Sequence, residues 1–163
     1  QGNASLLKVG NRTSDTPAGT QFYSGVLLAG SNFRAELWGA PGTGQPEGAL
    51  QPGSTFTTFR TGTGAGAVAP VTVTFDNIPK DYTGGGTFQL RVWDNSSGLY
   101  PTWTAFEQAW ANSPVDGGKS PLLNLNTTIG GDLTSPPYLA GLLGFNIYGG
   151  TGGKRGKAIK DLV

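Results

Sequence analysis

The chain of 163 residues contains no cysteine, no histidine and no methionine, and only 13% of its residues are charged. Without cysteine and histidine, zinc fingers, cysteine nucleophiles and Ser-His-Asp triads are excluded, and no histidine, cysteine or methionine can ligate haem. A formal net charge of +1 gives no electrostatic case for binding nucleic acid. Apolar runs are only a few residues long, so no segment predicts a membrane span. We therefore expect no cofactor, no metal, no nucleic-acid partner and no membrane insertion.

Glycine and proline are abundant instead, with 28 and 11 copies, and aromatic residues make up 10% of the chain. Hydrophobic residues total 36%, which is low for a globular protein but enough for a modest core, because they cluster in short runs. The polar remainder is rich in threonine, serine and asparagine. We interpret this composition as that of a secreted all-β protein without a disulfide framework.

The N-terminal residue also favours export. It is Gln1 rather than methionine, and we interpret it as a mature end left by signal-peptide removal, with an arbitrary chain boundary as the alternative. Four asparagines lie in N-glycosylation sequons, a number that a threonine-rich chain produces partly by chance: Asn3, Asn11, Asn95 and Asn126. The sequence leaves their glycosylation open.

Alternation of apolar and polar residues predicts several strands. The strongest signal is residues 87–93, where Phe88, Leu90 and Val92 would face a core and the residues between them would face outward. The other expected strands are residues 22–29, 33–38, 55–60, 71–75, 122–127 and 144–148. The glycine- and proline-rich residues 39–53 predict a long loop between two of them.

One helix is predicted, over residues 105–111. Thr104 and Glu107 have the spacing of a capping box, in which the threonine begins the helix and the glutamate bonds back to it. Phe106 and Trp110 are four residues apart and would share one face. Residues 112–114, Asn-Ser-Pro, end the helix.

The sequence divides into three parts. Residues 1–20 form an expected N-terminal arm with one short apolar stretch, residues 21–148 the β-sandwich body, and residues 149–163 a glycine-rich basic arm. The residues expected to anchor the arms on another copy are Leu6, Leu7, Val9, Lys154, Arg155, Lys157, Ile159 and Lys160.

No constellation of residues predicts an enzyme. Residues 62–67 match a relaxed dinucleotide-binding pattern, but a strand signal and not a helix follows them. Paired carboxylates could hydrolyse glycosides, yet Glu36 is expected on an exposed strand face, Glu47 in a loop and Glu107 in the helix cap. We therefore predict a protein without catalytic activity.

Tryptophan offers the one candidate for ligand contact. Trp38 and Trp93 are expected to face outward from strands, and Trp103 precedes the helix. Such rings can stack on sugars as a glycan or partner contact, or they can be covered by the helix or by a neighbouring subunit, and we favour coverage.

Three segments carry a family resemblance: residues 32–41 (NFRAELWGAP), 57–66 (TTFRTGTGAG) and 90–94 (LRVWD), followed by the helix, Gly118-Lys119-Ser120 and residues 136–145 (PPYLAGLLGF). In this order they resemble the secreted β-domain of bacterial proteins that carry a PEP-CTERM sorting tail, found in Verrucomicrobia-like bacteria. The resemblance spans roughly residues 20–148 and implies no catalytic residue. The Val-Pro-Glu-Pro signature and the membrane helix of such tails do not occur in this sequence.

The expected fold is all-β: an antiparallel β-sandwich, of jelly-roll or Ig-like type, with one short helix and extended terminal arms. A sandwich exposes edge strands, which an arm of another copy could extend by adding a strand. Such a contact is head-to-tail and propagates into a filament. The leading interpretation is a structural subunit of an extracellular or cell-surface filament that binds copies of itself. The alternative is a secreted carbohydrate-binding or adhesive module that binds glycans.

Overall fold

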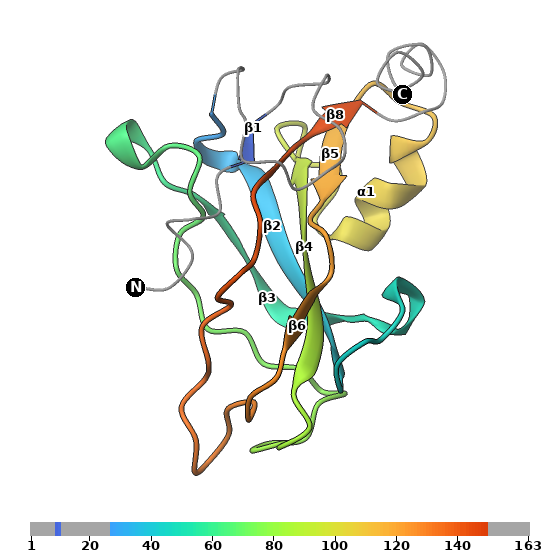
Figure 1. Ribbon diagram of the computed structural model, residues 1–163. Helices are drawn as coiled ribbons and strands as arrows, with labels where there is room; N and C mark the ends of the chain where they lie inside the picture. Colours follow the sequence, from blue (N-terminus) through green and yellow to red (C-terminus); the bar gives the residue numbers. More distant parts are fainter. Residues whose placement is uncertain (1–8, 11–26, 150–163) are drawn as a thin grey trace.

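A computed structural model describes residues 9–10 and 27–149 of the chain. Strands and one helix follow each other along the sequence (Figure 1). The elements are β1 (Val9–Gly10), β2 (Gly30–Pro41), η2 (Glu47–Ala49), β3 (Gln51–Phe59), η3 (Gly62–Gly64), β4 (Gly86–Asp94), α1 (Trp103–Trp110), β5 (Asp116–Lys119), β6 (Leu123–Leu125), β7 (Phe145–Asn146) and β8 (Tyr148–Gly149). The elements η2 and η3 are short 3-10 turns.

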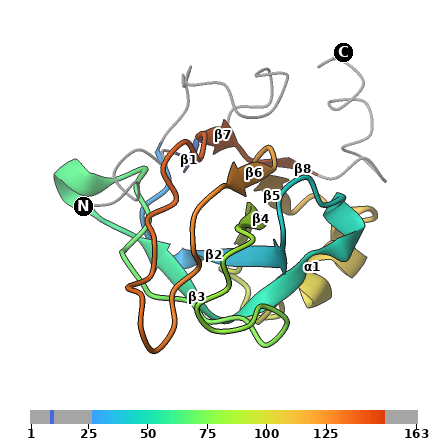
Figure 2. The same ribbon diagram turned by 60° about the horizontal axis from the view of Figure 1, so that its bottom comes forward.

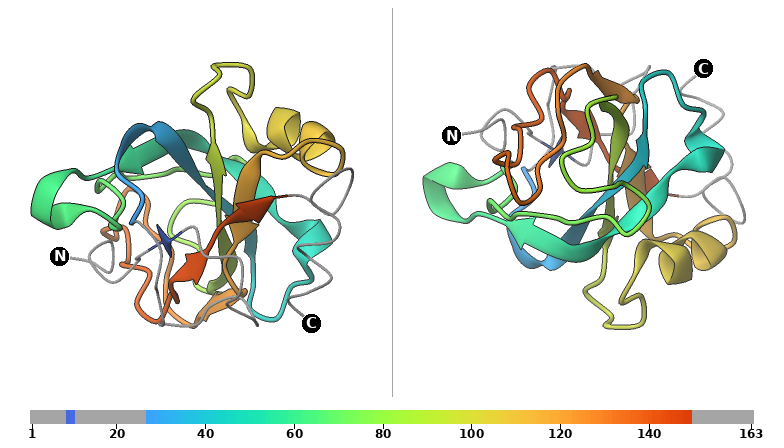
Figure 3. Two further views of the ribbon diagram at one scale, coloured as in Figure 1. Left: turned by 90° about the horizontal axis from the view of Figure 1, so that it is seen from above. Right: turned by 90° about the horizontal axis from the view of Figure 1, so that it is seen from below.

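Six strands form one antiparallel, open sheet in the order β3-β2-β4-β5-β8, with β6 also paired to β4. Strand β4 is its centre, because it pairs with β2 along one edge and with β5 and β6 in succession along the other. Views from above and below show the strong twist of the sheet (Figure 3). Strands β1 and β7 form a separate parallel pair. The expected antiparallel β-architecture with one helix is confirmed at this level, whereas a second stacked sheet is not described.

One face of the sheet carries the apolar core. Phe88, Leu90 and Val92 of β4 lie on this face and are buried, as the alternation predicts. Long irregular segments cover them instead of a second sheet (Figure 2). Those segments contribute buried or partly buried side chains from residues 67–85 and 126–147: Val68, Phe75, Ile78, Tyr82, Ile129, Leu139, Leu142, Phe145 and Ile147.

The opposite face of β4 is also buried, which corrects the expectation that it faces solvent. Helix α1 packs on this face through Trp103 and Phe106, and both side chains are 0% exposed. Trp93 of β4 completes the cluster and is likewise 0% exposed. Gly117 of β5 permits the close approach, because a Cβ at this position would overlap the Phe106 ring.

The helix is confirmed, but its start and cap differ from the prediction. It begins at Trp103, and the Thr102 hydroxyl, not that of Thr104, accepts a hydrogen bond of 3.2 Å from the Ala105 N–H. Thr102 therefore fills the N-cap position. Glu107 is exposed and lies outside the cap.

Two other local expectations are wrong. Residues 39–53 are not one long loop, because β2 continues to Pro41 and β3 begins at Gln51. Residues 71–75 are not a strand, although they follow the edge of β3 and the Ser54 N–H donates to the Thr74 carbonyl at 2.9 Å. Of the strand expected at 22–29, residues 27–29 are irregular and the rest lies outside the described residues.

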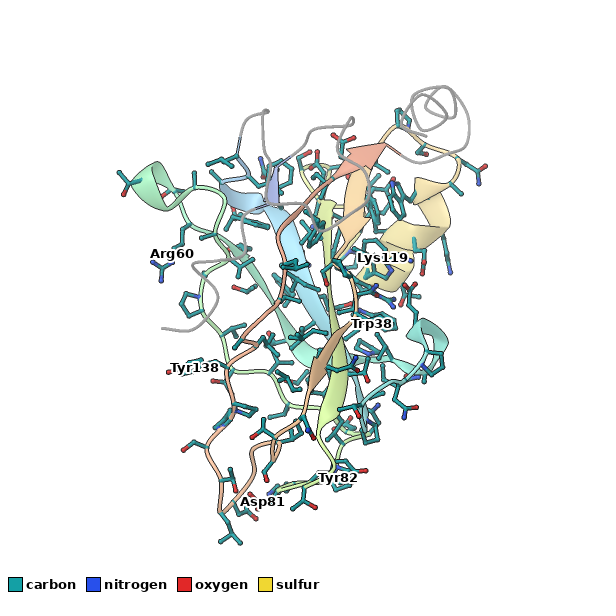
Figure 4. All side chains as sticks on the ribbon, viewed as in Figure 1. Trp38, Arg60, Asp81, Tyr82, Lys119 and Tyr138 are labelled. Atoms are coloured by element: carbon teal, nitrogen blue, oxygen red, sulfur yellow. The ribbon has the colours of Figure 1, made fainter. Side chains whose placement is uncertain are left out.

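A carboxylate joins two of the covering segments. Asp81 has a positive φ of 55° and its side chain accepts hydrogen bonds from the N–H groups of Asp132, Leu133 and Thr134. Desolvation acts to raise the pKa of Asp81, but these backbone hydrogen bonds lower the pKa overall. The turn at residues 131–134 is thereby fixed against the one that contains Asp81 and Tyr82, at one end of the sheet (Figure 4).

Candidate functional site

A group of charged and polar side chains lies on the helix-bearing face of the sheet, between α1 and η2. We call it the polar cluster: Glu36, Glu47, Gln89, Arg91 and Lys119. Its members come from β2, η2, β4 and β5, which the antiparallel pairing brings side by side. Figure 4 labels Lys119 and the adjacent Trp38 on this side of the molecule.

The register between β2 and β4 sets the inner part of the polar cluster. It places Glu36 opposite Arg91 and Trp38 opposite Gln89. Trp38 Nε1 donates a hydrogen bond of 2.7 Å to Glu36 Oε1, and the Arg91 guanidinium lies 3.8 Å from the centre of the Trp38 ring. The backbone N–H of Trp103, at the start of α1, also donates to the Glu36 carboxylate. The indole is therefore fixed from two sides.

The outer part of the polar cluster connects η2 to the sheet. Gln89 Nε2 donates to Glu47 Oε1 at 3.0 Å, and its Oε1 accepts from Arg91 Nε at 2.9 Å. Lys119 Nζ forms an ion pair of 2.6 Å with Glu47 Oε2. Glu47 thus accepts from two strands at once, and η2 is held over the sheet by both carboxylate oxygens.

The pKa values of the two carboxylates, Glu36 and Glu47, are shifted in opposite directions. Burial raises the pKa of Glu36, against the hydrogen bonds from Trp38 and Trp103 and the charge of Arg91. For Glu47, desolvation also acts to raise the pKa, but the hydrogen bonds from Lys119 and Gln89 lower it overall. Burial lowers the pKa of Arg91, a shift opposed by the charges of Glu47, Glu107 and Glu36.

The polar cluster has a buried layer and an accessible layer. The buried layer consists of Glu36, Gln89 and Arg91, which are 7%, 3% and 5% exposed. Trp38 is half-buried, and the side chains of Lys119 and Glu47 are 28% and 44% exposed. Part of an indole ring, a carboxylate and an ammonium group are therefore accessible to solvent. In the described part of the chain no group of histidine, cysteine, aspartate or glutamate side chains could hold a metal ion.

The three tryptophans expected as glycan or partner contacts have different surroundings. Trp93 and Trp103 are fully buried, and α1 covers Trp93, which is the favoured alternative of coverage. Trp93 Nε1 donates to the Tyr100 carbonyl at 2.8 Å. Of these three tryptophans, only Trp38 is partly exposed. A sugar could reach Trp38 in this structure but neither of the others.

The expected assembly residues fall mostly outside the described residues. These are Leu6, Leu7, Lys154, Arg155, Lys157, Ile159 and Lys160. Val9 lies in β1, which pairs in parallel with β7 of the same chain, Val9 opposite Phe145 and Gly10 opposite Asn146. The segment 145–149 then pairs with β5 through β8. Val9 therefore pairs with the segment that supplies Phe145 and Ile147 to the hydrophobic core.

Sequence reasoning missed Gln89 and Arg91, which were read as solvent-facing residues of an alternating strand. Glu36 was expected to be exposed and Glu47 was placed in a loop, so the four were not connected. The available signal was chemical: Glu36 and Arg91 each lie near the middle of a predicted strand, where a charged side chain needs a partner if the face is covered. The register that makes them neighbours could not be read from the sequence.

Comparison of the chain with protein-family models, with curated proteins and with solved structures finds no match. In the part of the chain that the structure describes, no helix is long and apolar enough to cross a bilayer. Support for a function therefore comes from the geometry of this chain.

Proposed function

We propose that this protein is a structural subunit of an extracellular or cell-surface filament, assembled head-to-tail by its terminal arms. The observation that supports this proposal is the pairing of β1 with β7. It shows that the N-terminal segment has a strand partner on the folded body. The same pairing can be formed by a segment from another copy, since identical chains offer identical partners.

The length of the link makes an exchange between copies sterically feasible. Residues 11–26 separate β1 from the body, and a link of this length spans at most about 55 Å when extended. A neighbouring domain of similar size lies within that reach. Each chain would then give its β1 to the next β7, and the surfaces that give and receive a strand differ, so the contact repeats in one direction.

The contact is small within one copy. Strand β1 has two residues and forms only a short ladder with β7. Each backbone hydrogen bond contributes about 1 kcal/mol net, so release of β1 from its own β7 costs little. Anchoring by further arm residues, for which Leu6 and Leu7 are the candidates, would favour the exchanged form at high protein concentration.

Deletion of residues 1–12 tests this proposal. We expect the full chain to form filaments that are visible by negative-stain electron microscopy and sediment in the ultracentrifuge. The shortened chain should remain folded by circular dichroism and sediment as a monomer. Unchanged polymerisation after the deletion would reject the N-terminal arm as the connecting element, and a full chain that stays monomeric at all concentrations would reject the filament.

A further inference from the structure

We propose that the accessible layer of the polar cluster, made of Trp38, Glu47 and Lys119, is a binding site for a neutral sugar chain. This site is independent of the arm exchange proposed above, because it lies on the helix-bearing face of the sheet and uses none of the arm residues. Of the three tryptophans predicted as glycan contacts, the site uses only Trp38, which is the one that solvent can reach.

The indole of Trp38 is held in place by its neighbours. Trp38 is held by its hydrogen bond to Glu36 Oε1 and by the Arg91 guanidinium on its ring. The pairing of β2 with β3 is irregular between Glu36 and Trp38, and such irregularities re-aim side chains next to functional sites. An indole that is already ordered loses little entropy when a sugar packs against the part of the ring that solvent reaches.

Hydrogen-bonding groups are connected to the position of the ring, because Trp38 lies opposite Gln89 and Gln89 bonds to Glu47. Glu47 offers a carboxylate, which is 44% exposed, and Lys119 offers ammonium donors. Gln89 holds the Glu47 carboxylate from below, since its Nε2 donates to Glu47 Oε1. A carboxylate and an ammonium side by side can together receive and donate the hydrogen bonds of neighbouring sugar hydroxyls, which are donors and acceptors at once.

The charges of the polar cluster balance each other, which favours a neutral ligand. The polar cluster contains two cationic groups, Arg91 and Lys119, and two carboxylates, Glu36 and Glu47. Both cations already face carboxylates, through the Lys119–Glu47 ion pair and the field of the glutamates on Arg91. An acidic sugar would have to displace Glu47, whereas a neutral one binds without an unpaired charge.

The test uses the full chain and isothermal titration calorimetry with four neutral hexasaccharides: cellohexaose, xylohexaose, chitohexaose and maltohexaose. Hexagalacturonate is the acidic comparison. We expect one neutral series to bind, with hexagalacturonate at least tenfold weaker. Trp38→Ala should lower the affinity by at least tenfold, and Glu47→Gln by about tenfold, the size of one charge-assisted hydrogen bond.

The matched control is Tyr138→Ala, which removes an aromatic ring that is 68% exposed and lies apart from Trp38 and Lys119 (Figure 4). It should bind like the unchanged protein. If Trp38→Ala does not fold, Trp38→Phe and Glu47→Gln decide, because both preserve the packing at the sheet. The proposal is overturned if no neutral hexasaccharide binds at millimolar concentration, if hexagalacturonate binds best, or if the folded Trp38 and Glu47 variants keep full affinity.

Discussion

The two faces of the central sheet differ in what covers them. On one face, Leu90 and Val92 lie in an apolar cluster with aliphatic and phenylalanine side chains. On the other face, the neighbouring residues Arg91 and Trp93 meet the polar cluster and the aromatic cluster under α1. The same alternating strand therefore carries an ordinary core on one side and a layer of paired charges on the other. A buried charge is stable only when it has partners. Because η2 and α1 supply some of these partners, the second face constrains where the two elements lie.

The largest expected effect is on the aromatic cluster. Phe106→Ala removes a fully buried ring that contacts Trp93, Trp103 and Trp110. We expect the free energy of unfolding to fall by about 3–5 kcal/mol, measured by denaturant titration. Leu99→Ala, at a side chain that is 70% exposed, should change it by less than about 0.5 kcal/mol. A small loss at Phe106 would mean that α1 does not form part of the core.

The next effect tests the buried charges. Arg91→Met leaves Glu36 without its cationic neighbour, and removal of one buried partner costs about 3–5 kcal/mol. Adding Glu36→Gln to the same chain should recover part of that loss. Denaturant titration of both single variants and the double variant gives the coupling energy. Strictly additive losses would show that Glu36 and Arg91 do not interact.

A smaller effect is expected where the helix approaches the sheet. Gly117→Ala places a methyl group against the Phe106 ring, so the ring or the helix must shift. Overpacking of this kind costs about 1–3 kcal/mol, which denaturant titration resolves. Gly48→Ala is a matched control, since a Cβ there meets no atom within 4 Å. Equal stability of the two variants would contradict the close contact between α1 and β5.

The smallest effect separates the two carboxylates by pH. Because burial raises the pKa of Glu36, its contribution to stability falls as the pH rises from the ordinary carboxyl pKa of about 4.3 to the higher folded value, and is constant above that. Glu36→Gln should remove this decline. The pKa of Glu47 is lowered, so its contribution is present above the ordinary value and is lost as the pH falls through the folded one.

Unfolding free energies measured between pH 3 and pH 8 provide the check. The Glu36→Gln variant should gain stability relative to the unchanged chain as the pH rises, whereas Glu47→Gln should lose less stability than the unchanged chain in acid. Identical pH profiles for the two variants would contradict the difference in environment between the buried and the accessible layer.

The sequence predicted the elements that local patterning controls. Residues 87–93 lie within β4 and residues 33–38 within β2, because alternation was strong in both. The prediction of one long loop at 39–53 failed, because some of its glycines and prolines lie within β2 and β3. Gly39 lies opposite Phe88, whose ring leaves no room for a Cβ. Pro52 lies in β3, at the edge of the sheet where proline is tolerated.

The candidate site could be predicted only in part, because it depends on register and on cover. Trp38 was singled out as an aromatic contact, and it lies at the accessible layer. Glu47 and Lys119 are 72 positions apart, and only the fold of η2 onto β5 joins them. The alternation in residues 87–93 predicted that Trp93 lies on the face opposite the apolar core. Local periodicity contains no information on whether a helix elsewhere in the chain covers that face.

The most direct test of the proposed assembly uses the absence of cysteine, since any disulfide must then come from introduced residues. Gly10 lies opposite Asn146, and paired strands are about 4.8 Å apart, within reach of a disulfide. A chain with Gly10→Cys is mixed with a chain with Asn146→Cys under polymerising conditions and oxidised, with Ser97→Cys, in an exposed turn, replacing Asn146→Cys as the control. Arm exchange predicts a covalent dimer from the first mixture and none from the control. A first mixture that remains monomeric, while a single chain carrying both substitutions closes its own disulfide, would contradict the exchange of β1 between copies.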